Sequence, residues 1–190
     1  FFCLLNCDII LITSFFEGFR DNSIIEFDKD FDLPPIASIF YDLIPLIMPE
    51  IYLDSNSEFK SFYLKRLEYL NKVDCLLSIS KSSSQEAYQY LSLDKSNVHN
   101  IYAGCDREIF YPADIKESPK TTKNNLDKYI LYSGAGDPRK NLNKLIEAYS
   151  LLNEELIWTY KLVLVGKLLP EEILLLKSWI TSLNLNLNQV

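Results

Sequence analysis

Short apolar runs alternate with longer runs of helical periodicity along most of this chain. The apolar runs are five or six residues long and rich in isoleucine, leucine and aromatic residues, as buried strands are. They occupy residues 7–12, 36–41, 75–80, 98–102, 129–133 and 162–166. Helical periodicity covers residues 56–72, 83–91 and 141–152, and begins again near Pro170. Alternation of this kind predicts an α/β fold with mostly parallel sheets.

Two details of the helical runs are also predicted. Ser83-Ser84-Gln85-Glu86 has the S-x-x-E spacing of a capping box, which would open the helix that ends near Leu91. The final residues, LNLNLNQV, are interpreted as the exit of the last helix followed by the start of a strand.

The alternation is interrupted at residues 111–127. This segment contains Pro112, Pro119, several charged residues and two threonines, a composition typical of a linker. We therefore expect two α/β domains, at 1–110 and 128–190, joined by 111–127. The second would hold only two complete strands, too few for an independently stable sheet. Because the chain also begins at Phe1, we expect it to be incomplete at both ends.

Composition excludes several function classes. A net charge of −7 and a pI near 4.8 leave no cationic excess for general binding to nucleic acid or anionic lipid. No apolar run is long enough to span a bilayer, so no transmembrane segment is expected. The cysteines are Cys3, Cys7, Cys75 and Cys105, and His99 is the only histidine. Without a C-x-x-C pair, this set predicts no zinc site and unpaired thiols, as suits a cytoplasmic protein.

One candidate site lies in the glycine-rich stretch 133–141, between a predicted strand and a predicted helix. Gly134 and Gly136 permit a tight turn and close approach of a ligand to the backbone. The amides that open the following helix favour an anion. Arg139 and Lys140 at that position suit a diphosphate. On these residues alone, a helix start with two solvated cations is an equally good interpretation.

Five stretches of the chain together resemble a known enzyme family. They are SFFEGFRDNS (14–23), FYDLIPLIMPEIYL (40–53), FYLKRLEYLNKVDCLLSISKSSSQEA (62–87), IYAGCDREIFYP (101–112) and SGAGDPRKNLNKLIEAY (133–149). They are similar to S-x-F-E-G, to H/Y-D-L-I-P-L, to a helix followed by A-D and S-x-x-S, to G-V-D-x-x-F-x-P and to G-G-x-D-P-R-K-N. On these motifs, in this order, the chain resembles the family 4 glycosyltransferases of GT-B type, particularly bacterial mannosyltransferase-like members.

The resemblance implies two Rossmann-like domains, both partial here, with the acceptor on the first and a nucleotide sugar on the second. It implies that Lys140 contacts the donor diphosphate, with Arg139, Gly134 and Gly136 beside it. It also implies a catalytic role for Asp42, which would hold the acceptor or a sugar hydroxyl. A loop or cap role before Pro45 is an equally good interpretation of Asp42.

Other positions matching the family motifs receive lesser roles. Glu17 matches the glutamate of S-x-F-E-G or simply solvates a turn, and Gly104 and Asp106 are expected to shape a loop. Tyr41 stands where many members have histidine, and Ala135 where many have arginine. Asp28-Lys29-Asp30 has D-x-D spacing, but its charged setting favours solvation, so no metal site is expected.

The activity implied is transfer of a hexose, mannose-like, with retained anomeric configuration and no cofactor. The donor would be a GDP- or UDP-linked sugar and the acceptor a glycan or lipid-linked glycan, at the inner face of the cytoplasmic membrane or in the cytoplasm. A family glycine-rich loop would precede Phe1, and a Glu-x7-Glu segment would follow Val190. The alternative is a truncated, inactive α/β fragment that acts at most as a binding module. An epimerase or dehydrogenase is disfavoured because G-x-G-x-x-G is missing.

Overall fold

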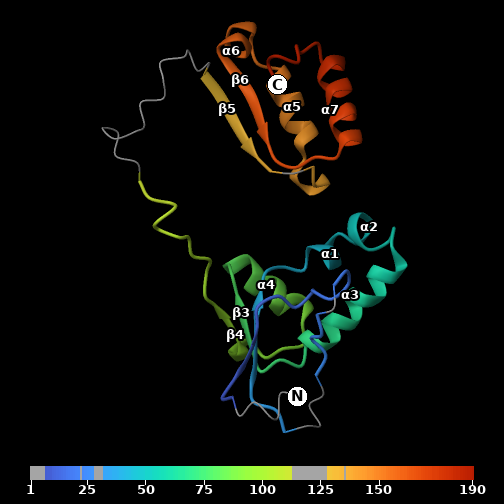
Figure 1. Cartoon of the computed structure of the whole chain (residues 1–190), viewed down its shortest axis with the longest axis vertical. Helices are drawn as coiled ribbons and strands as arrows, with labels where there is room; N and C mark the ends of the chain where they lie inside the picture. The colour runs from blue at the N-terminus through green and yellow to red at the C-terminus, as the bar shows by residue number, and fades with distance from the viewer. Residues whose placement is uncertain (1–6, 22, 28–31, 113–127, 135) are drawn as a thin grey trace. The chain divides into compact units, whose positions relative to one another are not determined.

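A computed structural model describes residues 7–21, 23–27, 32–112, 128–134 and 136–190. The chain divides into two compact units, Phe1–Tyr111 and Pro112–Val190, and each holds its own sheet (Figure 1). The predicted linker at 111–127 falls almost wholly outside the described residues. Because the strands within each sheet are parallel, the predicted α/β class with parallel sheets is confirmed.

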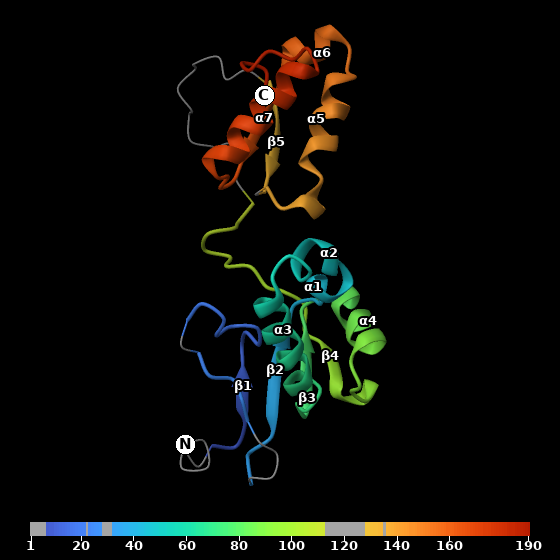
Figure 2. The same ribbon diagram turned by 90° about the vertical axis from the view of Figure 1, so that its right-hand side faces the viewer.

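The sheet of the first unit has four parallel strands in the order β1-β2-β3-β4 (Figure 2). They are β1 (Ile10–Ile12), β2 (Ile36–Phe40), β3 (Cys75–Ser78) and β4 (Val98–Asn100). The register places Ile36 opposite Ile10 and Phe40 opposite Ser78. The central strands are buried, but β1 is an outer strand on which Leu11 remains half-exposed. The prediction of a buried strand over 7–12 was therefore wrong in length and in burial.

Four helices accompany this sheet in the described part of the first unit. They are α1 (Ile44–Ile47), α2 (Pro49–Tyr52), α3 (Ser57–Leu70) and α4 (Lys81–Tyr90), with a 3₁₀ turn, η2 (Lys95–Asn97), before β4. Asn56 opens α3 by accepting a hydrogen bond from the Phe59 amide, and Leu67 and Leu70 then reach the core. The core also contains Phe15, Ile36, Phe40, Leu43, Leu53, Tyr63, Val73 and Leu76.

The predicted capping box of α4 was wrong. Ser80 has the extended backbone of an N-cap, and its side chain accepts a hydrogen bond from the amide of Ser83. The helix therefore begins at Lys81, before the predicted start, and Ser83 lies within its first turn. Glu86 is left free to bond elsewhere, as described below.

The second unit pairs β5 (Lys128–Ser133) with β6 (Tyr160–Val165) in parallel. Between them lie the 3₁₀ turn η3 (Pro138–Lys140), α5 (Leu142–Ser150) and α6 (Glu154–Thr159), and α7 (Pro170–Ser182) follows β6. In Figure 1, α5 and α7 lie beside each other on one side of the strand pair. The core of this unit consists of Ile146, Tyr149, Ile157, Leu162, Ile180 and Leu185.

The end of the chain forms a turn where the sequence predicted the start of a strand. The Gln189 carbonyl accepts a 2.8 Å hydrogen bond from the Leu162 amide of β6, and the Gln189 side chain accepts one from the Asn186 amide. The turn thus buries Leu185 in the core and brings the Gln189 carbonyl beside β6. The predicted helix exit is confirmed at Ser182.

Two further expectations concern membranes and thiols. Within the described ranges, every helix is too short or too polar to cross a membrane. Cys7, Cys75 and Cys105 are free thiols, and Cys3 lies outside the described residues.

Candidate active site

The glycine-rich turn leaves β5 at its carboxyl end. The Gly134 amide donates a 2.8 Å hydrogen bond to the Val165 carbonyl, which extends the β5–β6 ladder by one residue. A Cβ added at Gly136 would lie 2.7 Å from Leu168 Cδ2 and 3.0 Å from Glu172 Oε1. The backbone at Gly136 therefore passes close to the start of α7, and a side chain there would displace the ends of Leu168 and Glu172. Ala135 lies outside the described residues.

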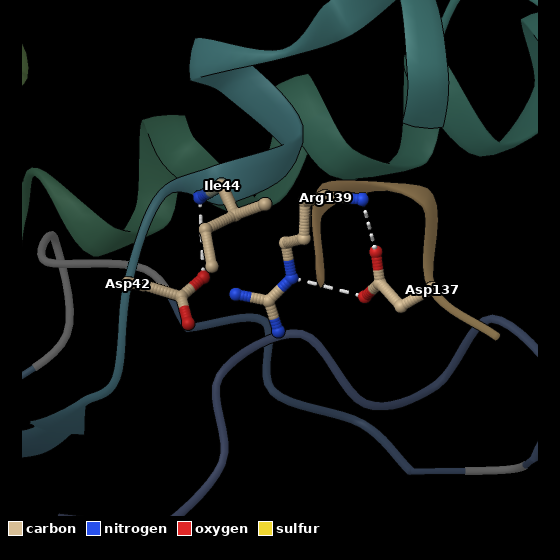
Figure 3. Close-up of polar contacts among 4 residues, drawn as sticks. All are labelled: Asp42, Ile44, Asp137 and Arg139. Atoms are coloured by element: carbon tan, nitrogen blue, oxygen red, sulfur yellow. Dashed lines mark hydrogen bonds and ion pairs between the residues drawn. The ribbon is translucent and has the colours of Figure 1, made fainter. Parts of the chain in front are cut away.

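Arg139 is paired within its own turn. The Asp137 carboxylate accepts hydrogen bonds from the Arg139 amide, at 3.1 Å, and from Arg139 Nε, at 2.9 Å (Figure 3). Asp137 thereby caps η3 and neutralises much of the Arg139 charge. Both predicted cations lie on this 3₁₀ turn, before the helix rather than on it.

The Lys140 amide donates a 3.0 Å hydrogen bond to the Asp137 carbonyl, whereas its side chain is exposed and makes no hydrogen bond or ion pair with the described residues. The next residue, Asn141, has a left-handed backbone (φ 51°) and provides no side-chain cap for α5. The amides of Leu142 and Asn143 consequently lack a side-chain acceptor. An unneutralised cation thus precedes a helix start with open amides, which together favour an anionic ligand.

A cavity of about 510 Å³ adjoins this turn. Gly136, Asp137 and Asn143 line it from the turn and α5, and Glu172 and Trp179 line it from α7. Of the predicted donor-binding residues, Gly136 lines the cavity, whereas Gly134, Arg139 and Lys140 do not. The α7 residues were missed because no local pattern indicates which helix packs beside the turn.

Asp42 lies between the end of β2 and the start of α1, at the carboxyl edge of the first sheet. It is half-buried, and its Oδ1 accepts a 3.1 Å hydrogen bond from the Ile44 amide (Figure 3). The carboxylate therefore makes a local loop contact before Pro45, as one of the two interpretations above expected, and Leu43 is the N-cap of α1. The second carboxylate oxygen of Asp42 is left for another donor.

Helix α4 holds the segment on both sides of Asp42. Glu86 Oε2 accepts a 2.8 Å hydrogen bond from the Leu43 amide, and the Ser83 hydroxyl donates to the Tyr41 carbonyl. These contacts join residues more than forty positions apart, so the local spacing that suggested a capping box could not show them.

Tyr63 of α3 is buried near Asp42 and Glu86. Burial raises the pKa of the Tyr63 hydroxyl, and the carboxylates of Asp42 and Glu86 raise it further, whereas the Leu46 backbone partly offsets them. Its ring stacks on Phe16 with centroids 4.5 Å apart. Tyr63 therefore connects the 14–18 loop to the Asp42 segment and remains protonated at neutral pH.

The remaining motif residues have local roles. Glu17 is exposed and accepts a 2.9 Å hydrogen bond from the Ser14 hydroxyl. Asp106 accepts a hydrogen bond from the Glu108 amide and so stabilises a turn. Among the residues that the structure describes, no cluster of three or more histidine, cysteine or acidic side chains could hold a metal. The D-x-D stretch at 28–30 lies outside them.

Comparison with known proteins gives consistent results. Residues 114–190 match the family model described as glycosyl transferases group 1. The serotype-specific mannosyltransferase WbdA of Escherichia coli is 35% identical over 169 residues, which are 87% of this chain and 21% of WbdA. The O-antigen chain mannosyltransferase B of Escherichia coli is 26% identical over 132 residues, 68% of this chain and 34% of that protein.

A solved structure shares the fold. Anabaena Alr3699/HepE, crystallised in complex with UDP, matches with a TM-score of 0.57 and 20% identity over 83% of this chain and 41% of that one. The chain therefore spans about a fifth of the length of WbdA and less than half of HepE.

Proposed function

Since this chain belongs, through residues 114–190, to the group 1 glycosyltransferases, we propose that it takes part in transfer of a hexose from a nucleotide-diphosphate sugar. The transferred sugar is mannose-like, because the curated relatives are mannosyltransferases. The acceptor is a glycan or lipid-linked glycan, and the transfer retains anomeric configuration. No cofactor takes part.

The observation that carries this proposal is the start of α5. Lys140 has no counter-charge among the described residues, and the Leu142 and Asn143 amides have no side-chain acceptor. A donor diphosphate satisfies all three groups at once. The complex of HepE with UDP supports a nucleotide diphosphate as the ligand of this fold.

Hexose transfer requires the nucleoside diphosphate to leave with increasing negative charge. A nearby cation and the fixed dipoles of helix amides stabilise that charge as it develops. Lys140 and the open amides of α5 take this role. Gly134 and Gly136 allow the backbone to approach the diphosphate, and Arg139, already bonded to Asp137, acts mainly by shaping the turn.

On the acceptor side, we assign Asp42 to a hydroxyl of the acceptor or of the transferred sugar. One carboxylate oxygen is fixed by the Ile44 amide, and α4 fixes the flanking backbone through Glu86 and Ser83. Such fixing is what a positioning carboxylate requires. We place the reaction in the cytoplasm, or at the inner face of its membrane, in keeping with the free thiols Cys7, Cys75 and Cys105.

Calorimetric titration of the chain with GDP and UDP tests the proposal, with EDTA present throughout. We expect one nucleotide to bind and AMP, which lacks the diphosphate, to bind at least tenfold more weakly. A transfer assay with GDP-mannose and UDP-glucose then measures turnover. Binding without turnover would favour the binding-module alternative, whereas absence of diphosphate binding would contradict the proposal.

A further inference from the structure

A separate cavity of about 450 Å³ lies in the first unit, between the 14–21 loop and the start of α3. Its aromatic lining comes from Phe16, Phe19, Tyr52 and Phe59. Phe19 meets Phe59 edge-on, with ring centroids 5.0 Å apart, and Phe16 is stacked on buried Tyr63. The rings are half-buried and held by packing against one another, so they offer a fixed apolar surface.

The polar lining of this cavity contains two carboxylates, Glu17 and Asp21, beside Arg20, Ser55 and Asn56. Glu17 accepts from the Ser14 hydroxyl and Asp21 from the Ser23 amide, at 2.9 and 2.7 Å. Hydrogen bonds from Ser23 lower the pKa of Asp21, so its carboxylate is ionised at neutral pH. Local hydrogen bonds orient both carboxylates, and each retains capacity to accept others. Asn56, whose Oδ1 caps α3, contributes its amide nitrogen as a donor.

The loop that carries Glu17 and Asp21 packs against Arg66 at Gly18. Gly18 has φ +103°, and a Cβ there would lie 2.4 Å from the Ser23 carbonyl oxygen and 2.8 Å from Arg66 Nη2. Arg66 is itself buried and packs over the Phe62 ring, 4.9 Å from its centroid. The loop therefore turns tightly over a packed side chain, which orients Glu17 and Asp21 before any ligand arrives.

We propose that this cavity binds one neutral hexopyranose residue of the acceptor glycan. The apolar C–H face of the sugar lies on Phe19 and Phe59, and its hydroxyls donate to Glu17 and Asp21. The two carboxylates disfavour a phosphate or phospholipid headgroup, although Arg20 also lines the cavity. The volume is in the range of small-ligand pockets, about 300–1,000 Å³. This inference rests on the proposed function for the identity of the ligand as an acceptor.

Saturation-transfer NMR with methyl α-D-mannopyranoside and α-linked mannobiose tests the assignment. We expect transfer to the ring protons of both sugars with the unmodified chain. Affinity should fall at least fivefold for Glu17→Gln, which keeps the shape but removes the charge, and further for Phe59→Ala. Glu58→Gln is the matched control, because Glu58 is exposed beside Phe59 and does not line the cavity.

The outcomes separate the two proposals. Equal affinity of the Glu17→Gln and Glu58→Gln variants for mannobiose would overturn the subsite, as would absence of sugar binding at about 20 mM while GDP or UDP still binds. Sugar binding that depends on Glu17, in a chain that binds no nucleotide diphosphate, would support the subsite and contradict the proposed transfer. Nucleotide binding should be the same in all three variants.

Discussion

The backbone N–H of Leu43 donates a 2.8 Å hydrogen bond to the carboxylate of Glu86, 43 residues further along the chain. Leu43 is fully buried, so water cannot replace this acceptor. The bond attaches the backbone after Asp42 to helix α4. The position of the Asp42 carboxylate therefore depends on helix α4, which lies far from Asp42 in the sequence.

Replacing Glu86 with alanine should lower the free energy of unfolding of the first unit by about 1–3 kcal/mol, because the Leu43 amide would be buried without a partner. Glu86→Gln retains an acceptor oxygen and should lose less. Urea unfolding followed by circular dichroism measures both. Gln85→Ala, at an exposed neighbouring position on α4, is the control and should stay within about 0.5 kcal/mol. A loss for Glu86→Ala no larger than this control's would contradict the prediction.

Gly18→Ala should be strongly destabilising. The added methyl would meet the Ser23 carbonyl oxygen at 2.4 Å, and the backbone has φ +103°, which L-residues rarely adopt. We expect a cost of about 1–3 kcal/mol. Gly104→Ala is the matched control, since nothing lies within 4 Å of its Cβ position. If the two alanine variants unfold at the same urea concentration, the tight turn over Arg66 is not required.

In the second unit, the buried Tyr149 hydroxyl lies 2.7 Å from the Tyr160 carbonyl oxygen and 3.2 Å from that of Ile157. Tyr149→Phe should therefore cost about 0.5–1.5 kcal/mol. Both tryptophans belong to this unit, so their fluorescence during urea unfolding reports the loss. Tyr129→Phe, on half-exposed Tyr129 of β5, should be nearly neutral. Comparable shifts for the two variants would argue against a structural role for the Tyr149 hydroxyl.

The exposed pair Lys65–Glu26, 2.8 Å apart, should give a pH-dependent contribution to stability. The hydrogen bond from Lys65 lowers the pKa of Glu26. The same hydrogen bond raises the pKa of Lys65. The contribution is thus present above the ordinary Glu26 pKa of 4.5 and disappears as pH falls through the lowered value. The difference in urea midpoint between the unmodified chain and Glu26→Gln should be small at pH 7, smaller in 1 M salt, and absent near pH 2. A difference that persists at about pH 2 would exclude the pair as its source.

Parallel α/β architecture could be predicted because strand length and helical period are local signals. The runs at 36–41 and 75–80 became β2 and β3, and α7 began at Pro170 as predicted. Local signals failed where two of them competed. Ser80 is the N-cap of α4, so the helix starts before the S-x-x-E stretch that the sequence favoured as its cap. LNLNLNQV forms a turn that packs Leu185 against the core.

The candidate site likewise has one part that could be predicted from the sequence and one part that could not. The glycine-rich turn was evident from sequence, because its glycines and cations are contiguous. Its surroundings were not: the packing of α7 against Gly136, the Leu43–Glu86 bond and the burial of Arg66 all depend on tertiary contacts. Residues distant in sequence carry no spacing pattern from which such contacts could be inferred.

The last prediction concerns Lys140, the cation that would contact the donor diphosphate. Departure of the diphosphate increases its charge, so the contact should strengthen in the transition state, and Lys140→Ala should lower both donor affinity and turnover. Loss of one such donor typically costs about 100- to 1,000-fold in rate.

Two further variants sharpen this test. Lys140→Arg should recover only part of the loss, because a planar fork does not replace a point charge. Lys144→Ala, on the adjoining helix α5 and paired with Glu147 at 2.7 Å, is the matched control and should bind GDP or UDP like the unmodified chain. The fold should survive in every variant, since the Lys140 side chain is exposed and makes no described contact. If calorimetry and the transfer assay place Lys140→Ala within about twofold of Lys144→Ala, well under 1 kcal/mol, then Lys140 is only a surface charge and the diphosphate is held elsewhere.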